Sequence, residues 1–583
     1  MKRIATFIVV LVALFNVNLI SQIIDVQPGY GTLNDAIIAN GGNKTYKLQA
    51  GGWYGLSAII EINSPITIIG TPTTAGQMQA MIQTGSNPSG ITFSNMFTVG
   101  ADITLRNIYL VNADLNNSYG PIVFNQMNPA RIEMDSVTCD PVCGWILVNL
   151  ITGPGNLHIT NSLMMRHSVE TSGIYDYPFI NCGSDAGFDT IYVENSTFVD
   201  MGFSFYNALV SFQRGSDGPD HFIWFNHNSF IFGKSDLLNE YYTTSTFFTN
   251  NLMYEWNIMP FTNDFGIWFM NYGDEGPHNT RTCLVKADTV VINGTPESFP
   301  SQRKYFVGYN SNYRDPRINS LISLGKDSGH VSYLQPLVSP PSMKDISREA
   351  QMFSDKTNFP HFVNAANIED QPEANPIFTD QKIYTLTDSA LAWANSVTRQ
   401  FWGMSSPPAS EWAHYYYSLD TAAGYPIAWP RFNGAYTSSK LLTASIEGLP
   451  LGDLNWFPSK KAIWQEHQVE VMNHILGQDT SVINITSVKQ SDNLQPTIFS
   501  LSQNYPNPFN PTTEIKYSIP ESGMVTLKVY NLLGQELVTL VNLEQKSGNY
   551  TVNFNASKLA SGVYMYRIQA GNFLLTKKMT LLK

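Results

Sequence analysis

A short pattern of alternating residues recurs six times within residues 103–253, and it constrains the fold of this chain more than any other feature. In the first copy, apolar Ile103 and Leu105 are followed by polar Asn107 and then by apolar Leu110. Successive copies lie 23 to 34 residues apart. A repeat of this length with variable loops is typical of a chain that winds into stacked coils. The polar members of the six copies are Asn107, Ser136, Asn161, Asn195, His227 and Asn250.

The alternation on both sides of the polar residue predicts two short strands joined by a tight bend, because side chains change face at every residue of a strand. We expect the polar side chain to point inward at the bend, where stacked amides hydrogen-bond from one coil to the next. These features predict a parallel β-helix. The alternative, an antiparallel β-sandwich, would not keep a polar residue in the same slot of successive repeats.

Length and composition agree with a repeat architecture. The chain has 583 residues and a mass of 65.1 kDa, which is too much for one ordinary core, but stacked coils absorb that length. Only 14% of the residues are charged, the net charge is −12 and the pI is about 5.3. Nucleic-acid binding needs a basic surface, so we expect no nucleic-acid partner. Aromatic residues make up 13% of the chain, and exposed aromatic faces can stack on sugar rings, although most aromatics fill interiors.

Residues 1–21 have the features of a secretory signal peptide. Lys2 and Arg3 precede an apolar run over residues 4–15, and Asn16 interrupts that run before it reaches the length of a membrane span. No other stretch approaches that length, so we expect no transmembrane helix in the mature chain.

The chain has four cysteines, too few to form its framework. Export permits disulfides, so Cys139 and Cys143 could close a small loop; a buried thiol at Cys139 is an equally good interpretation. The two cysteines have no second ligand pair at a spacing suited to zinc.

Residues 31–38 have helical apolar spacing and are followed by strand-like residues 66–70. Together with residues 46–52, they resemble the start of exported right-handed β-helix proteins of the pectate-lyase superfold, and the resemblance covers roughly residues 24–300. It implies a right-handed parallel β-helix and a family rich in polysaccharide lyases and hydrolases. The chain lacks the Trp-Ile-Asp-His and Arg-x-Pro-x-x-Arg patterns of pectate lyases, so no family catalytic residue can be transferred to it.

We expect the β-helix over residues 22–340 and a loop-rich, partly helical cap over 341–477 that covers exposed strand edges. The clearest helix in that cap spans residues 459–476, where apolar residues share one face and Gly477 follows. Residues 478–496 are polar and have no core pattern, which predicts a linker.

Residues 497–583 alternate apolar and polar in short runs, which predicts a small Ig-like β-sandwich. The segment from Tyr505 to Lys583 closely resembles the type A C-terminal sorting domain of type IX secretion. The resemblance implies a Gram-negative bacterium of the Bacteroidetes or a related lineage and recognition by the secretion machinery. It also implies passage through the periplasm, followed by release or display on the outer-membrane surface.

Two Gly-Ser-Asp loops end in Asp185 and Asp217, each ten residues before the polar residue of its repeat, and an equal count from Asn250 reaches Glu240. If the coils stack in register, these carboxylates lie about 4.8 Å apart and favour a bound cation, for which calcium is the expected ion. Arg214 and Lys234 are then the candidate catalytic bases of a lyase acting on an acidic polysaccharide. The alternative is that Gly-Ser-Asp is ordinary turn chemistry.

Two functions therefore remain open from the sequence. The first is an exported protein that binds or processes polysaccharide; its enzymatic form would be a calcium-assisted polysaccharide lyase or, as the alternative, a glycoside hydrolase. The second is a non-catalytic, adhesin-like surface protein, because fold alone does not determine activity. In both, the expected partner is a polysaccharide or a cell-surface glycan.

Overall fold

A computed structural model describes residues 22–582 apart from a set of gaps. It divides into two compact units, residues 1–486 and 487–583, which are considered separately. The predicted signal peptide and Cys143 lie outside the described residues. The gaps are 74–76, 116–117, 119, 141–145, 166–178, 183–186, 202–205, 208–221, 234–236, 241–244, 257–260, 263–284, 288–290, 293–294, 297–302, 319–331, 334–352, 370–371, 385–386, 389–432, 484, 486–498, 505–506, 508, 521, 532–534, 558 and 571–572.

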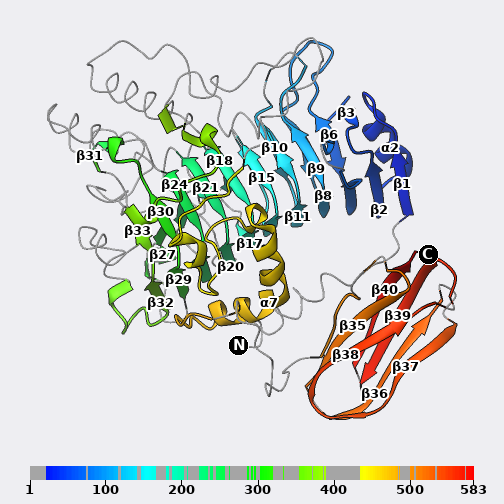
Figure 1. Ribbon diagram of the computed structural model, residues 1–583. Coiled ribbons are helices and arrows are strands. Elements are labelled where there is room, and N and C mark those ends of the chain that lie inside the picture. Colours follow the sequence, from blue (N-terminus) through cyan, green and yellow to red (C-terminus); the bar gives the residue numbers. More distant parts are fainter. Residues whose placement is uncertain are drawn as a thin grey trace. The chain divides into compact units, whose positions relative to one another are not determined.

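The first unit is a parallel β-helix built of three long sheets, as predicted (Figure 1). Sheet A contains β1 (Gln22–Val26), β2 (Lys44–Leu48), β5 (Ile66–Gly70), β8 (Ile103–Arg106), β11 (Ala130–Asp135), β14 (Gly155–Thr160), β17 (Phe188–Glu194), β20 (Phe222–Asn226), β23 (Ser245–Thr249), β29 (Lys304–Gly308) and β32 (Phe362–Ala365). Sheet B contains β3 (Trp53–Gly55), β6 (Ala80–Gln83), β9 (Ile108–Val111), β12 (Thr138–Cys139), β15 (Leu163–Met165), β18 (Thr197–Met201), β21 (Ser229–Gly233), β24 (Leu252–Trp256), β30 (Ser311–Tyr313) and β33 (Ile368–Glu369). Sheet C contains β4 (Ile60–Ile62), β7 (Asn95–Val99), β10 (Ile122–Gln126), β13 (Ile146–Leu150), β16 (Ile180–Cys182), β19 (Tyr206–Asn207), β22 (Leu238–Glu240) and β26 (Val285–Ala287).

The repeat read from the sequence aligns the strands of sheet A as expected. Its first apolar position stacks from Ile103 through the equivalent residues of each coil to Thr246 in continuous parallel register. Its last apolar position stacks in the same way along sheet B, from Leu110 to Met253. The inward side chains at these positions form one continuous apolar core.

The polar residue of each repeat lies at the bend between sheets A and B, but it does not form the inner ladder, and that prediction was wrong. All six residues are left-handed, with φ between 48° and 58°. A left-handed residue reverses the alternation, so the next residue points inward instead. The ladder is therefore made of Ser162, Ser196, Asn228, Asn251, Asn310 and Asn367, each accepting from the backbone N–H of the inward residue one coil earlier at 2.9 to 3.1 Å.

A helix covers the N-terminal end of the solenoid. In α2 (Thr32–Asn40), Leu33 is fully buried in the solenoid core, and the Asn34 amide bonds to the backbone of Ser57 and Ala58. These contacts cover the first coil, which would otherwise expose its apolar interior.

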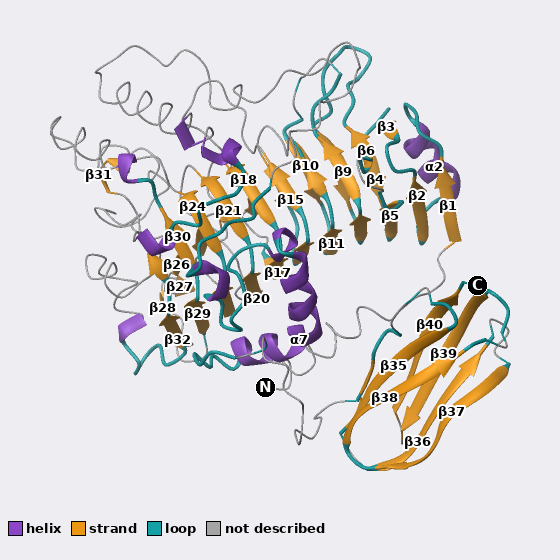
Figure 2. Cartoon of the chain, in the orientation of Figure 1, coloured by secondary structure: helices purple, strands orange, loops and turns teal. Residues whose placement is uncertain are grey.

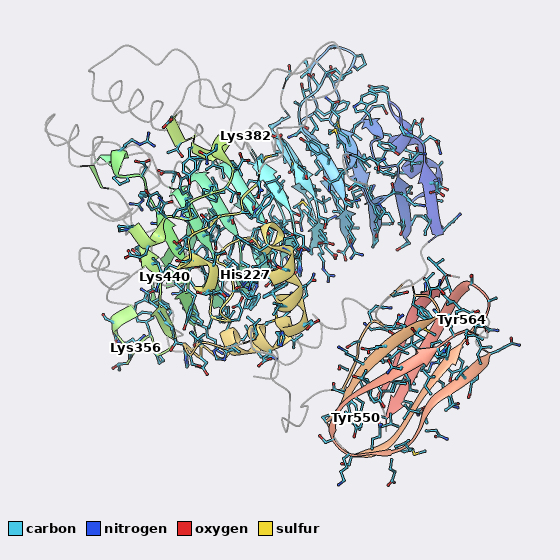
Figure 3. All side chains as sticks on the ribbon, in the orientation of Figure 1. His227, Lys356, Lys382, Lys440, Tyr550 and Tyr564 are labelled. Carbon is cyan, nitrogen blue, oxygen red and sulfur yellow. The ribbon has the colours of Figure 1, made fainter. Side chains whose placement is uncertain are left out.

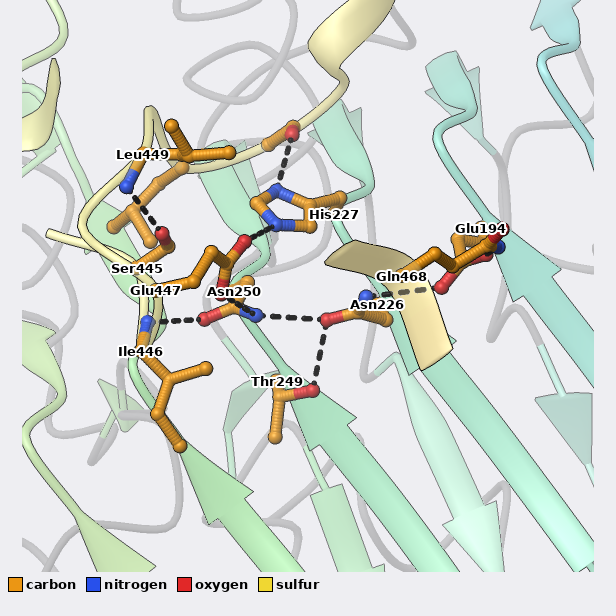
Figure 4. Close-up of polar contacts among 12 residues, drawn as sticks. Glu194, Asn226, His227, Thr249, Asn250, Ser445, Ile446, Glu447, Leu449 and Gln468 are labelled. Carbon is orange, nitrogen blue, oxygen red and sulfur yellow. Dashed lines mark hydrogen bonds and ion pairs between the residues drawn. The ribbon is translucent and has the colours of Figure 1, made fainter. Parts of the chain in front are cut away.

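The outer faces of sheets A and B are covered in their C-terminal halves by residues 433–485, which include α7 (Pro458–Leu476) (Figure 2). Val471 and Ile475 of α7 pack on an aromatic row of sheet A that includes Trp224. We refer to residues 433–457, which precede α7, as the strap. It is joined to the solenoid by a buried polar network (Figure 4) in which Glu447 pairs with His227 and accepts from Asn250. The same His227 is labelled in Figure 3.

The second unit is a β-sandwich of two antiparallel sheets. One sheet contains β34 (Ser500–Leu501), β35 (Thr512–Ile519) and β38 (Gly548–Asn555). The other contains β37 (Glu536–Gln545), β36 (Gly523–Tyr530), β39 (Gly562–Ala570) and β40 (Phe573–Leu581). The inward residues of both sheets form a separate apolar core, so this unit does not share its core with the β-helix.

Candidate functional site

The connections between the sheets indicate which face of the β-helix can carry a site. The bend from sheet A to sheet B stays tight in every coil from β8 to β24, whereas the connections on either side of sheet C vary widely in length. In solenoids, insertions gather around the face that binds a partner. On the side leading into sheet C, the connecting segments are residues 112–121, 140–145, 166–179, 202–205, 234–237 and 257–284.

A column of polar residues runs along the outer face of sheet C. Glu61, Thr98, Asn125 and Asn149 are register partners in successive coils. Their flanking residues point into the core, and the four side chains themselves are exposed or half-buried. The same register position continues through the backbones of Asn181, Asn207, Asn239 and Lys286.

The described side chains of this column already form hydrogen bonds along the solenoid axis. The Thr98 hydroxyl donates to Glu61 at 3.1 Å, and the Asn149 amide donates to Asn125 Oδ1 at 3.0 Å. Asn125 uses its own amide only in a weak 3.6 Å contact with the sulfur of Met127. The hydrogen bonds within these two pairs keep the hydroxyl and amide groups in fixed positions.

The covered halves of the other two sheets cannot offer such a surface. On sheet A, Tyr192, Trp224 and Phe247 are buried beneath α7 and the strap. On sheet B, Ile231 and Tyr254 are buried beneath residues of the strap and of the segment around Phe378. Sheet C is therefore the best candidate for a functional face in the described part of the chain.

The predicted site residues lie almost entirely outside the described residues. This applies to Asp185, Asp217, Arg214 and Lys234. Glu240 is described only as the last residue of β22, where its backbone pairs with Ala287. In the part of the chain that the structure describes, no group of three or more His, Cys, Asp or Glu could hold a metal ion.

The register of sheet C shows that the predicted calcium ligands were not aligned correctly by counting residues. Asn181, Asn207 and Asn239 are register partners, yet they precede the bend residues Asn195, His227 and Asn250 by 14, 20 and 11 residues. The connections from sheet C to sheet A thus differ in length. Counting ten residues back from each bend therefore does not reach equivalent positions, and Glu240 is not placed beside the two aspartates by this count.

The sequence analysis missed the sheet C column, although a signal for it was present. An asparagine occupies the same place in β10, β13, β16, β19 and β22. Several of these strands are only two or three residues long and follow connections of irregular length, so the repeat is not visible until the register is known.

The Cys139 side chain is buried in the apolar core. Because Cys143 lies outside the described residues, the disulfide and the buried thiol both remain predictions. Within the described residues, no helix is long and apolar enough to span a membrane.

Glu255, near the end of β24, is a buried carboxyl group with an incomplete set of hydrogen bonds. It is fully buried, with Oε1 accepting from the backbone N–H of Asp315 at 2.8 Å and no hydrogen-bond partner for Oε2. Burial raises the pKa of Glu255 to about 8, against a smaller opposing effect of the hydrogen bond from Asp315.

This raised pKa predicts a pH-dependent stability. The folded state favours the neutral form of Glu255. The folded protein is therefore most stable, as far as this group is concerned, below pH 4.5, and it loses this stability as the pH rises to about 8 and the buried carboxyl group must ionise. Glu255→Gln should unfold at a higher temperature than the wild type at pH 8.5, and the two should converge near pH 4.5. The difference is on the order of 1.4 kcal/mol per unit of pKa shift. Identical melting temperatures at both pH values would contradict the assignment.

Comparison with known proteins identifies the second unit. Residues 503–581 match the family described as the secretion system C-terminal sorting domain. This confirms the predicted type IX sorting domain and shows that the protein is exported to the cell surface or secreted.

Comparison with solved structures gives a weaker likeness. A solved structure titled "Structure of PL6 family alginate lyase AlyGC" is 16% identical, covering 41% of this chain and 36% of the lyase chain, with a TM-score of 0.25. No curated protein matches the sequence of this chain.

Proposed function

We propose that this exported protein binds a polysaccharide along the outer face of sheet C. The observation that carries the proposal is the column of hydroxyl, amide and carboxylate side chains formed by Glu61, Thr98, Asn125 and Asn149, one from each coil. Adjacent coils of a parallel sheet are about 4.8 Å apart, a spacing comparable to the length of one sugar unit.

The chemistry of the column suits a polymer rich in hydroxyl groups. An amide both donates and accepts, so it can bond to a sugar hydroxyl in either orientation. A regular column presents the same groups repeatedly and therefore matches a ligand that is itself repetitive. Because these side chains are held by one another, little conformational entropy is lost when a ligand binds.

Export supports the same proposal. A protein delivered to the cell surface or the medium by a sorting domain meets polysaccharides of cell envelopes and of the surroundings. Cleavage of the bound polysaccharide is a separate proposal. The calcium-assisted lyase remains a proposal in which Asp185 and Asp217 would hold the ion and Arg214 or Lys234 would remove a proton.

Binding should depend on the amides of the column. In Asn125→Ala/Asn149→Ala, two groups that can bond to the ligand are removed, each contributing about 0.5 to 1.5 kcal/mol. We expect affinity for the preferred polysaccharide to fall about tenfold or more in affinity electrophoresis or calorimetry. Asn156→Ala is a matched control, because Asn156 is a half-buried asparagine on sheet A.

The ligand can be found with a panel of neutral and acidic polysaccharides, each tested with and without calcium. Loss of binding in the double variant but not in the control supports the proposal, and equal affinity in all three proteins contradicts it. The same panel, read by absorbance of unsaturated sugar products, tests for a lyase. Binding without such products identifies a non-catalytic, adhesin-like protein.

A further inference from the structure

Lys461, in the first turns of α7, has its ammonium group between two side-chain amides. Its Nζ donates to Asn455 Oδ1 at 2.5 Å and to Asn161 Oδ1 at 2.6 Å. Asn455 belongs to the short 3-10 helix η8 (Leu454–Trp456), while Asn161 is the bend residue between β14 and β15. The lysine nitrogen is therefore held against the carboxamide of both asparagines.

A buried carboxyl group completes this arrangement. Asp453 is 2% exposed, and its Oδ1 accepts from the Asn455 side-chain Nδ2 at 2.7 Å. Its Oδ2 accepts from the Thr197 hydroxyl at 2.7 Å. Asp453 thus contacts the nitrogen of the same carboxamide whose oxygen contacts Lys461.

The surroundings favour the uncharged forms of both groups. Burial raises the pKa of Asp453 to about 7, against opposing hydrogen bonds from Asn455 and Thr197 and the nearby charge of Lys461. Burial lowers the pKa of Lys461, with the negative charges of Asp453, Asp135 and Glu194 acting in the other direction. An amine and a carboxylic acid carry the same number of protons as the ion pair, and removal from water favours this neutral pair.

We propose that Lys461 and Asn455 form an intramolecular isopeptide bond, with Asp453 as the acid–base group. The neutral Nζ attacks Cγ of Asn455, a new Nζ–Cγ bond forms, and the Cγ–Nδ2 bond breaks. Asp453 gives a proton to Nδ2, which leaves as ammonia, and recovers a proton from Nζ. Atoms balance without an oxidant, a reductant or any other reactant.

Asn455 is the assigned acceptor because of where the carboxyl groups lie. The Nδ2 of Asn161 also meets a carboxylate, donating to Asp135 Oδ1 at 2.6 Å. However, Asp135 is only partly buried and also accepts from the Thr160 hydroxyl at 3.0 Å. Only Asp453 combines contact with the leaving nitrogen and complete removal from solvent.

The bond would join the first turns of α7 to the 3-10 helix that ends the strap. Asp453 also accepts the backbone N–H of Asn455 at 2.8 Å, so this corner is already held by several short contacts. A covalent link at the same place would hold the start of α7 against η8.

Peptide mapping of the purified full chain tests the proposal. Trypsin should release one branched peptide, in which residues 441–460 are joined to the peptide that begins at Lys461, with a mass lower by one ammonia than the sum of its parts. Fragmentation should place the link between Lys461 and Asn455. Linear peptides ending at Lys460 and at Lys461, with no branched product, would overturn the proposal.

Variants separate this chemistry from cyclisation of Asn455 alone, which also releases ammonia. In Lys461→Arg a long basic side chain stays but the amine nucleophile is lost, so the loss of ammonia should disappear completely. Asp453→Asn should slow or abolish the link while keeping a polar group toward Thr197. Loss of ammonia that persists in Lys461→Arg, or a branch that joins Lys461 to Asn161, would contradict the assignment. The wild-type digest and Lys461→Arg decide the question if Asp453→Asn fails to fold.

Discussion

Replacing Glu447 by alanine is expected to destabilise the β-helix unit by about 3 to 5 kcal/mol, because it removes one partner of a fully buried contact and leaves Nε2 of His227 without its partner. Glu447 and His227 are both fully inaccessible to solvent. The second oxygen of Glu447 accepts from Asn250 Nδ2 at 3.1 Å, so two buried groups lose a partner in one change. Chemical denaturation, with the midpoint and slope compared between the variant and the wild type, measures this effect.

Glu447→Gln is the matched control for this experiment. Its amide has a similar shape and can still bond to His227 and Asn250, so it should cost clearly less than alanine. The strap should also become more accessible to proteases in Glu447→Ala, because Glu447 is one of the groups that join it to sheets A and B. A change below about 1 kcal/mol would show that this network does not anchor the strap.

The second large effect is expected at the inner ladder. In Asn251→Leu, the Oδ1 that accepts from the backbone and the side chain of Asn228 is lost, as is the Nδ2 that donates to Phe225 and Asn310. Each buried group left without a partner costs about 1 to 3 kcal/mol, so we expect a loss of about 3 kcal/mol or more despite the added apolar surface.

Asn156→Leu on sheet A is a control for this ladder variant, because Asn156 is only half-buried and takes no part in the ladder. It should change the unfolding free energy by less than about 0.5 kcal/mol. A melting temperature of Asn251→Leu equal to that of the wild type would show that the ladder does not stabilise the coils.

The strands of the β-helix could be predicted because their order is local and periodic. Alternation fixes which residues face the core, and the repeated polar residue fixes where each coil bends, so the register from Ile103 to Thr246 followed directly. The ladder was misplaced by one residue because alternation does not reveal backbone handedness. Left-handed φ at His227 and Asn250 turns these side chains outward, toward residues that come much later in the sequence.

The contacts of α7 and the strap could not be predicted from the sequence. Lys461 with Asn161, and Glu447 with His227, are residues more than 200 positions apart, and no spacing rule connects them. The candidate site was also hard to predict, because the sheet C column lies in short strands between connections of unequal length. Only the sheet register shows that Asn125 and Asn149 occupy equivalent positions.

The position of a bound oligosaccharide tests the central claim most directly. A crystal structure of the protein with a fragment of the polysaccharide that it binds should show the sugar chain along sheet C, parallel to the solenoid axis. Sugar hydroxyls should lie within hydrogen-bond distance of Thr98, Asn125 and Asn149. A sugar chain bound on sheet A or sheet B, with no contact to these residues, would contradict the account.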